Sequence, residues 1–214
     1  MIVGKQKPLS EIREMIAPYK RILVLGCGTC VTVCFAGGEK EVGILASALR
    51  IAERTEDKVI NEYTVKRQCD WEFLDKLDER VKEIDAILSL ACGVGVQAIS
   101  ERFPNTPVLP GLDTLFMGMP VEEGIWMERC SGCGNCILDK TGGICPVTRC
   151  TKGLLNGPCG GTNNGKCEVD PEKDCAWTLI YQKLEKQGKL DLFDEYHPPR
   201  NFQAVIRPGK FTTK

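Results

Sequence analysis

The chain has 214 residues, and 28 Lys and Arg stand against 29 Asp and Glu, so its formal net charge is −1. Because no basic stripe or run of lysines accompanies this balance, we expect neither nucleic acid nor an acidic lipid surface as a partner. The start of the sequence lacks an apolar segment with a small-residue cleavage site, and no apolar run reaches the roughly 18 residues of a membrane-spanning helix. We therefore expect a cytoplasmic protein with no membrane partner.

The sequence is rich in cysteine and poor in histidine. It contains 13 cysteines, and His197 is its only histidine. Because thiols stay reduced in the cytosol, so many cysteines favour metal binding over a disulfide framework. Zinc fingers with two histidines and histidine-ligated Rieske centres are excluded within one chain. Any metal site must therefore be built almost entirely from thiolates.

The first part of the chain, residues 1–120, is predicted to be an α/β domain. Short apolar runs predict strands, and apolar residues at helical spacing predict helices. The predicted strands cover 21–25, 62–65, 85–90 and 108–109, and the predicted helices cover 39–54, 71–84 and 97–102. This alternation of strands and helices is typical of a small doubly wound parallel sheet.

The second part, residues 121–214, is predicted to be a loop-rich cysteine domain for metal clusters. Gly, Cys, Asn, Thr and Pro dominate residues 130–167, so we expect ligated metal to order this segment. A helix over 175–186 follows, because apolar side chains share one helical stripe there. The members of this stripe are Ala176, Trp177, Ile180, Tyr181 and Leu184. The tail from Tyr196 contains several prolines and should be extended.

Three cysteines follow one another at short, equal spacing. Cys130, Cys133 and Cys136 are separated by two residues each, so one turn of chain can place three sulfurs around one face of an iron-sulfur cubane. The bacterial ferredoxin pattern begins in this way and ends on a cysteine followed by proline, as Cys145-Pro146 does here. Eight residues separate Cys136 from Cys145, whereas the ferredoxin pattern has about three. The ferredoxin ligand pairing therefore cannot be transferred to this chain.

The eight cysteines of the second part are sufficient for two four-thiolate sites. They are Cys130, Cys133, Cys136, Cys145, Cys150, Cys159, Cys167 and Cys175. Neighbouring glycines allow backbone amides to approach the sulfurs and tune the cluster potential. A pair of zinc-thiolate knots needs the same ligands, but three cysteines at two-residue gaps favour the cubane, because zinc sites usually pair two C-x2-C arms.

Five more cysteines follow the predicted strands of the first part. They are Cys27, Cys30, Cys34, Cys69 and Cys92. Because the carboxyl ends of parallel strands converge on one crevice, these residues can meet in space. We expect four of the five to form a third metal site.

Three other interpretations of these residues are open. Cys27-Gly-Thr-Cys30 resembles a thioredoxin-type redox pair. The segment Gly93-Val-Gly-Val-Gln-Ala98, with Asp113 farther on, is close to a dinucleotide-binding fingerprint. Cys69 and Cys92 would also fit as small buried core residues. No catalytic serine-histidine-acid set and no P-loop is recognisable.

Several sequence segments resemble a known family. They are 128–136 (ERCSGCGNC), 141–146 (TGGICP), 150–161 (CTKGLLNGPCGG), 165–169 (GKCEV) and 175–177 (CAW). Together they are similar to the cysteine-rich family of methylenetetrahydrofolate reductase C-terminal domains. The segments 25–30 (LGCGTC) and 34–38 (CFAGG) extend the resemblance over the full length, to the MetV-type small iron-sulfur subunits of bacterial and archaeal reductases.

This resemblance implies a role in reducing 5,10-methylenetetrahydrofolate to 5-methyltetrahydrofolate. The folate chemistry would take place on a partner catalytic subunit that carries FMN or FAD. This chain would pass electrons to or from that flavin through two to three [4Fe–4S] clusters, with zinc as an alternative at one site. Further electron-donor subunits would complete the complex. The competing functions are a structural zinc-thiolate subunit and a dinucleotide- or dithiol-dependent oxidoreductase.

Overall fold

The computed structural model describes residues 1–53, 58–205 and 207–213. The chain divides into two compact units, Met1–Met127 and Glu128–Lys214. The sequence had suggested a division between residues 120 and 121. Each unit has its own core, and the two differ in how much regular structure they contain.

The first unit is built around a four-stranded parallel sheet. Its strands are β2 (Arg21–Cys27), β3 (Val59–Val65), β4 (Ala86–Leu90) and β5 (Val108–Pro110). They lie in the order β3-β2-β4-β5, and every neighbouring pair is parallel. β4 is buried along its whole length and β2 along all but its first residue, as their continuous apolar runs require in a sheet covered on both faces. The predicted α/β class is confirmed.

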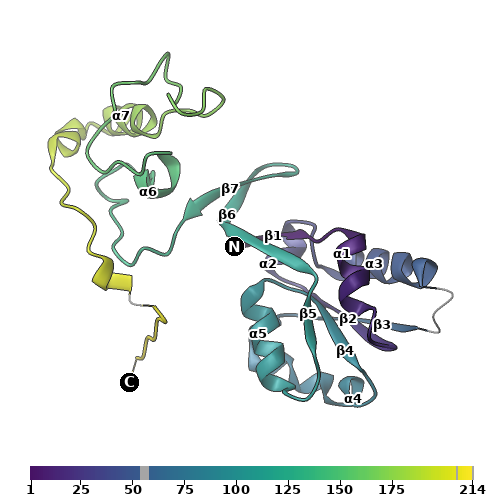
Figure 1. Ribbon diagram of the computed structural model, residues 1–214. Helices are drawn as coiled ribbons and strands as arrows, with labels where there is room; N and C mark the ends of the chain where they lie inside the picture. The colour runs from purple at the N-terminus through teal and green to yellow at the C-terminus, as the bar shows by residue number, and fades with distance from the viewer. Residues whose placement is uncertain (54–57, 206, 214) are drawn as a thin grey trace. The chain divides into compact units, whose positions relative to one another are not determined.

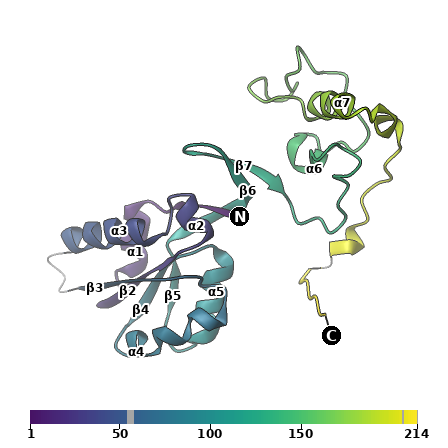
Figure 2. The same ribbon diagram turned by 180° about the vertical axis from the view of Figure 1, so that it is seen from behind.

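Helices cover both faces of this sheet (Figures 1 and 2). α1 (Leu9–Ile16) and α3 (Glu39–Ala52) contribute to the buried cluster on one face, and α4 (Asp78–Val81) and α5 (Gly93–Arg102) to the cluster on the other. The chain therefore leaves β2 toward one face and β4 toward the opposite face. The carboxyl ends of these two neighbouring strands form the topological switch point of a doubly wound sheet.

Two predicted helices differ from the observed ones. The helix predicted over 39–54 is α3, and Arg54 lies outside the described residues. The helix predicted over 71–84 is wrong in type, because the chain forms the 3₁₀ turns η1 (Trp71–Phe73) and η2 (Asp75–Leu77) before the short α4. Trp71, Leu74 and Leu77 recur every three residues, which is the repeat of a 3₁₀ helix. Leu74 and Leu77 are buried, whereas Trp71 is 54% exposed.

A second, antiparallel element of the first unit was not predicted. It contains β1 (Ile2–Gln6), β6 (Leu112–Glu122) and β7 (Ile125–Cys130) in the order β1-β6-β7. β1 pairs antiparallel with β6 from Ile2 opposite Met117 to Gln6 opposite Leu112. β7 runs into the second unit at Glu128. Only two residues of β6 are buried, so its sequence lacks the apolar signal that identified the parallel strands.

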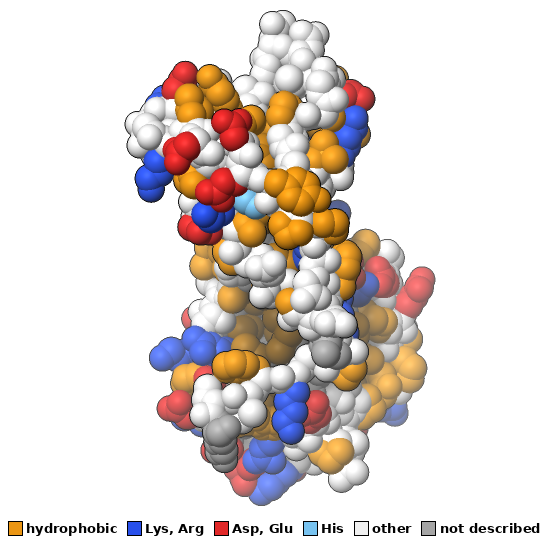
Figure 3. Space-filling view, turned by 90° about the vertical axis from the view of Figure 1, so that its left-hand side faces the viewer, with side chains coloured by type: hydrophobic (Ala, Val, Ile, Leu, Met, Phe, Trp, Pro, Cys, Tyr) orange, Lys and Arg blue, Asp and Glu red, His pale blue; other side chains and the backbone are white. Residues whose placement is uncertain are grey.

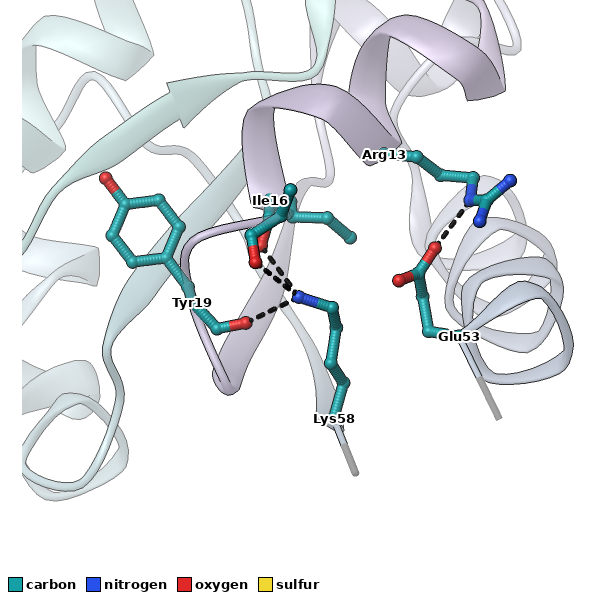
Figure 4. Close-up of polar contacts among 6 residues, drawn as sticks. Arg13, Ile16, Tyr19, Glu53 and Lys58 are labelled. Carbon is teal, nitrogen blue, oxygen red and sulfur yellow. Dashed lines mark hydrogen bonds and ion pairs between the residues drawn. The ribbon is translucent and has the colours of Figure 1, made fainter. Parts of the chain in front are cut away.

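Polar contacts fix the carboxyl end of α1 (Figure 4). Lys58 Nζ donates hydrogen bonds to the carbonyl oxygens of Ile16, Ala17 and Tyr19 at 3.2, 2.8 and 2.9 Å. Ile16 is the last residue of α1, Ala17 is its C-cap and Tyr19 follows in the turn, so the lysine provides hydrogen bonds beyond the helix's own donors and a positive charge that suits the helix dipole. On the same helix, Arg13 pairs with the buried carboxylate of Glu53, which follows α3.

The second unit contains little regular structure apart from α7 (Ala176–Gln187). The short helix α6 (Pro146–Arg149) and the 3₁₀ turns η3 (Leu190–Asp194) and η4 (Phe202–Val205) accompany it. The predicted stripe of α7 is buried as expected except at Tyr181, which is 43% exposed. Trp177 and Tyr181 both meet the ring of Phe193 edge to face. A small apolar core thus forms around one helix.

The tail is attached to the cysteine loops by its backbone. The side-chain amide of Asn156 accepts a hydrogen bond from the His197 amide at 2.6 Å and donates one to the His197 carbonyl at 2.8 Å. His197 therefore takes part through its backbone. On the face drawn in Figure 3, acidic and basic side chains are interspersed. Within the described ranges, each helix is too short or too polar to cross a lipid bilayer.

Candidate metal centres

Four thiols of the second unit line one pocket. Cys130, Cys133, Cys136 and Cys145 line a hollow of about 330 Å³. Gly132 and Gly134 have φ angles of +64° and +72°, which residues with a side chain rarely adopt. These glycines turn the chain sharply between the cysteines, so that successive thiols face the same space. The Gly132 amide donates to Cys130 Sγ at 3.4 Å, and such contacts stabilise a ligating thiolate.

The other four thiols of this unit line a second, much smaller pocket. Cys150, Cys159, Cys167 and Cys175 surround about 20 Å³. Trp177 forms part of its wall, and its indole Nε1 donates to the carbonyl oxygen of Leu154 at 3.1 Å. Trp177 therefore packs against the cysteine loops.

Hydrogen bonds favour the thiolate form at two cysteines of the second pocket. The hydroxyl of Thr151, followed by the amides of Val169 and Asp170, lowers the pKa of Cys167. At Cys175 burial alone would raise the pKa, but hydrogen bonds from Thr178, Thr162 and the Trp177 amide lower it overall. Cys175 is the N-cap of α7, where the helix dipole favours negative charge. Thiolates are the species that bind metals.

An acidic side chain also reaches the second pocket. Cys159 Sγ donates to Glu168 Oε2 at 3.2 Å, and Lys152 Nζ lies 2.9 Å from Glu168 Oε1. The Lys152 ammonium, followed by the Cys159 thiol, lowers the pKa of Glu168. A metal bound by the Cys159 thiolate would replace this proton with its own positive charge.

One short helix links the two pockets. Cys145 is the N-cap of α6 and Cys150 is its C-cap, and these cysteines line different pockets. A chain of five residues spans at most about 18 Å when fully extended, and the helical turn shortens this distance. The two thiol sets therefore lie next to each other along the chain and in space.

The thiol-lined pockets are not yet closed coordination shells. Within the described residues, no three His, Cys, Asp or Glu side chains stand in metal-binding geometry. The donor set nevertheless suits thiophilic metals, because each pocket offers four cysteines and the first also offers glycine amides. The structure thus brings all eight predicted cysteines into two sets of four, a pairing that spacing alone left open.

Three of the five cysteines in the first unit come together. Partial loss of contact with water raises the pKa of the Cys69 thiol, and the charges of Cys27 and Cys92 raise it further, so the three sulfurs are within electrostatic reach. Cys34 lies elsewhere: its sulfur is 3.5 Å from both the amide nitrogen and the carbonyl oxygen of Gly4 in β1. The interpretation of Cys69 as a buried core residue is wrong, because this cysteine is exposed.

The residues of the suspected dinucleotide fingerprint have other roles. A Cβ on Gly95 would lie 2.7 Å from Ala91 Cβ and 3.0 Å from Gln68 Cβ, so close packing requires this glycine. The Gly93 amide donates to Thr114 Oγ1 at 2.8 Å. Asp113 lies in antiparallel β6 and pairs with Lys7 at 2.8 Å. These contacts account for the motif without a nucleotide.

Sequence reasoning missed a pair of buried polar residues beside these thiols. Gln68 and Ser89 are both fully buried. Gln68 Nε2 donates to the Leu25 carbonyl at 2.8 Å, and Ser89 Oγ donates to Gln68 Oε1 at 2.6 Å. The signals in the sequence were a glutamine next to Cys69 and a serine inside an otherwise apolar strand.

Comparison with known families agrees with the sequence resemblance for the second half of the chain. Residues 109–203 match the family model described as "Methylene-tetrahydrofolate reductase C terminal". The matched range contains both thiol-lined pockets and α7. No curated protein and no solved structure matches the chain.

Proposed function

Because residues 109–203 are related to the C-terminal family of methylene-tetrahydrofolate reductases, we propose that this chain is the small iron-sulfur subunit of such a reductase. It carries electrons to or from the flavin of a separate catalytic subunit, on which methylenetetrahydrofolate is reduced. The observation that carries this proposal is the grouping of eight cysteines into two adjacent four-thiol pockets. Iron-sulfur clusters held by four cysteines are one-electron carriers.

The size and openness of the first pocket support a cluster at Cys130, Cys133, Cys136 and Cys145. Its volume of about 330 Å³ leaves room for a group of several atoms between the sulfurs. Cys130 and Cys136 are exposed, so a centre bound there lies near the surface and is accessible to a redox partner. Bound clusters would supply reversible one-electron chemistry, while the chain holds them and sets their surroundings.

The second pocket supports a different occupant, and with it the alternative function. A volume of about 20 Å³ is close to the roughly 10 to 15 Å³ that a single water molecule needs, so it is far too small for a cluster of several atoms without rearrangement. A single Zn²⁺ is closer to this size than a cluster is, and Cys150, Cys159, Cys167 and Cys175 would have to close around it. If zinc fills both pockets, the chain is a structural subunit that moves no electrons.

Metal analysis with spectroscopy of the full chain tests the proposal. We expect protein reconstituted without oxygen to contain iron and acid-labile sulfide and to give an EPR signal when reduced. Cys133→Ser should remove the iron and sulfide of the first centre and leave the second. Cys150→Ser should remove the iron or zinc of the second centre and leave the first.

The control variant is Cys34→Ser, because this buried thiol lies in the first unit, on the backbone of β1. It should retain the iron, sulfide and zinc content of the unmodified chain. If the protein contained zinc but no sulfide, and if the reduced protein gave no EPR signal, the structural alternative would be established. With the flavin subunit present, Cys133→Ser should stop donor-driven flavin reduction, while reduction by small dyes continues.

A further inference from the structure

The switch point of the parallel sheet brings three cysteine-bearing segments together. Cys27 is the last residue of β2 and pairs with Val65, the last residue of β3. On the other side of β2, Gly26 pairs with Leu90 at the end of β4, and Cys92 follows two residues later. The three strands therefore end at one level, at the edge where ligands bind in doubly wound folds.

Gln68 holds the segment after β3 over the ends of the two central strands. Its amide group bridges the Leu25 carbonyl in β2 and the Ser89 hydroxyl in β4. Because Cys69 is the next residue, this buried bridge places it beside Cys27 and Cys92.

The loop after β2 is pressed against the end of β4. A Cβ on Gly37 would lie 2.0 Å from the Leu90 carbonyl oxygen, and the Cys27 amide donates to the Gly37 carbonyl at 2.9 Å. This close contact keeps the segment containing Cys27 and Cys30 next to Cys92. Cys30 is partly exposed, three positions after Cys27, in the C-x2-C spacing that commonly supplies two ligands to one metal.

Cys34 is the cysteine that this geometry leaves out. Burial does not distinguish it, because Cys27 at 6% and Cys34 at 7% exposure belong to the same apolar cluster, and only the contacts of Cys34 differ. Its sulfur contacts the backbone of Gly4 and the Val31 carbonyl. Those contacts occupy the thiol and hold it against β1, so Cys34 acts as a core residue.

We propose that Cys27, Cys30, Cys69 and Cys92 form a third, four-thiolate metal site at the switch point of the first unit, and that Cys34 is not a ligand. The site takes a thiophilic centre, a chemistry shared by Zn²⁺ and a [4Fe–4S] cluster. Cys92 is the N-cap of the ten-residue helix α5, whose dipole favours the negative charge of such a centre. The inference is independent of the proposed function, because none of these ligands belongs to the second unit.

Counting metals in the full chain tests this site. Each of Cys69→Ser and Cys92→Ser should lower the content by one centre, which is about four iron and four sulfide for a cluster or one zinc for a single ion. The double variant should lose no more than either single variant, because both residues serve the same centre. Cys69 is exposed, and serine is a favoured N-cap at position 92, so both variants should fold.

Cys34→Ser is the matched control and should keep the full metal content. The inference is overturned if Cys69→Ser and Cys92→Ser retain every metal, if their losses add in the double variant, or if Cys34→Ser loses as much as they do. The proposed function is tested separately by the metal content of Cys133→Ser and Cys150→Ser, because both of these cysteines lie in the second unit.

Discussion

Gln68 links two strands by its side chain, although glutamine is rarely found in a protein core. It is fully buried, and both ends of its amide group have partners, one in β2 and one in β4. A buried amide is tolerated only when such bonds are made. The position of Cys69 thus depends on a residue that binds no metal itself.

Replacing Gln68 with leucine should therefore destabilise the first unit. The substitution leaves the Leu25 carbonyl and the Ser89 hydroxyl without their partner, at a cost of about 2 kcal/mol. The urea-denaturation midpoint should fall accordingly, and the metal content of the third site should fall with it. Gln97→Leu is the control, since Gln97 is exposed on α5 and bonds only within its own helix. Equal midpoints for the two variants would contradict this role of Gln68.

At this scale, part of the candidate site was predictable from cysteine spacing. Cys130, Cys133 and Cys136 had to share a site because so few residues separate them. The fourth cysteine of the first pocket was not predictable from spacing, since Cys145 and Cys150 both follow Cys136 and α6 directs them into different pockets. The contact of Cys34 with Gly4 likewise depends on β1, which precedes it by about 30 residues in the sequence.

Among the secondary-structure elements, α1 depends on a lysine that follows α3 in the sequence. Lys58 closes the carboxyl end of α1 through three carbonyl oxygens. Ile12 and Ile16 of the same helix are fully buried against the sheet. The cap and the apolar face together hold α1 in position.

Lys58→Met should loosen this end of α1 while keeping the apolar part of the side chain. We expect a loss of about 1 kcal/mol, because several hydrogen bonds to helix-terminal carbonyls disappear together with a favourable charge. Hydrogen exchange should accelerate at the amides of Ile16 and Ala17 and remain unchanged in β4. Lys82→Met is the matched control, since Lys82 pairs only with the exposed Glu79. Unchanged exchange in α1 would show that packing alone holds the helix.

The strands that could be predicted are those that are buried and therefore have continuous runs of apolar residues. β2 and β4 are buried on both faces and were recognised from their apolar residues. β6 is exposed along most of its length, so its pairing with β1 depends on a partner more than 100 residues away. The region 71–84 showed its apolar positions clearly, but the spacing of three was mistaken for a helical stripe.

The whole molecule combines two units that are stabilised in different ways. The first unit has two apolar clusters, one on each face of its parallel sheet. The second has one small cluster around α7 and long loops that contain the eight cysteines. If the proposed metals bind, a segment with so little apolar core would gain much of its folding free energy from them.

Removing metal should therefore unfold the two units to different extents. After acid treatment and chelation, amides of residues 130–167 should lose their protection against hydrogen exchange, whereas those of β2 and β4 should keep it. Restoring iron and sulfide, or zinc, should return protection to the second unit. If both units lost protection together, or if neither did, metal would not be the main source of order in the second unit.

The two thiol sets of the second unit also follow one another in sequence without interleaving. Cys145 completes the first set before Cys150 begins the second. During synthesis on the ribosome, every cysteine of the first set emerges before any cysteine of the second. If each set binds a metal centre, as proposed, the two centres could be loaded in the order of translation. A half-made chain then contains one complete set of thiols rather than two incomplete sets that compete for the same metal.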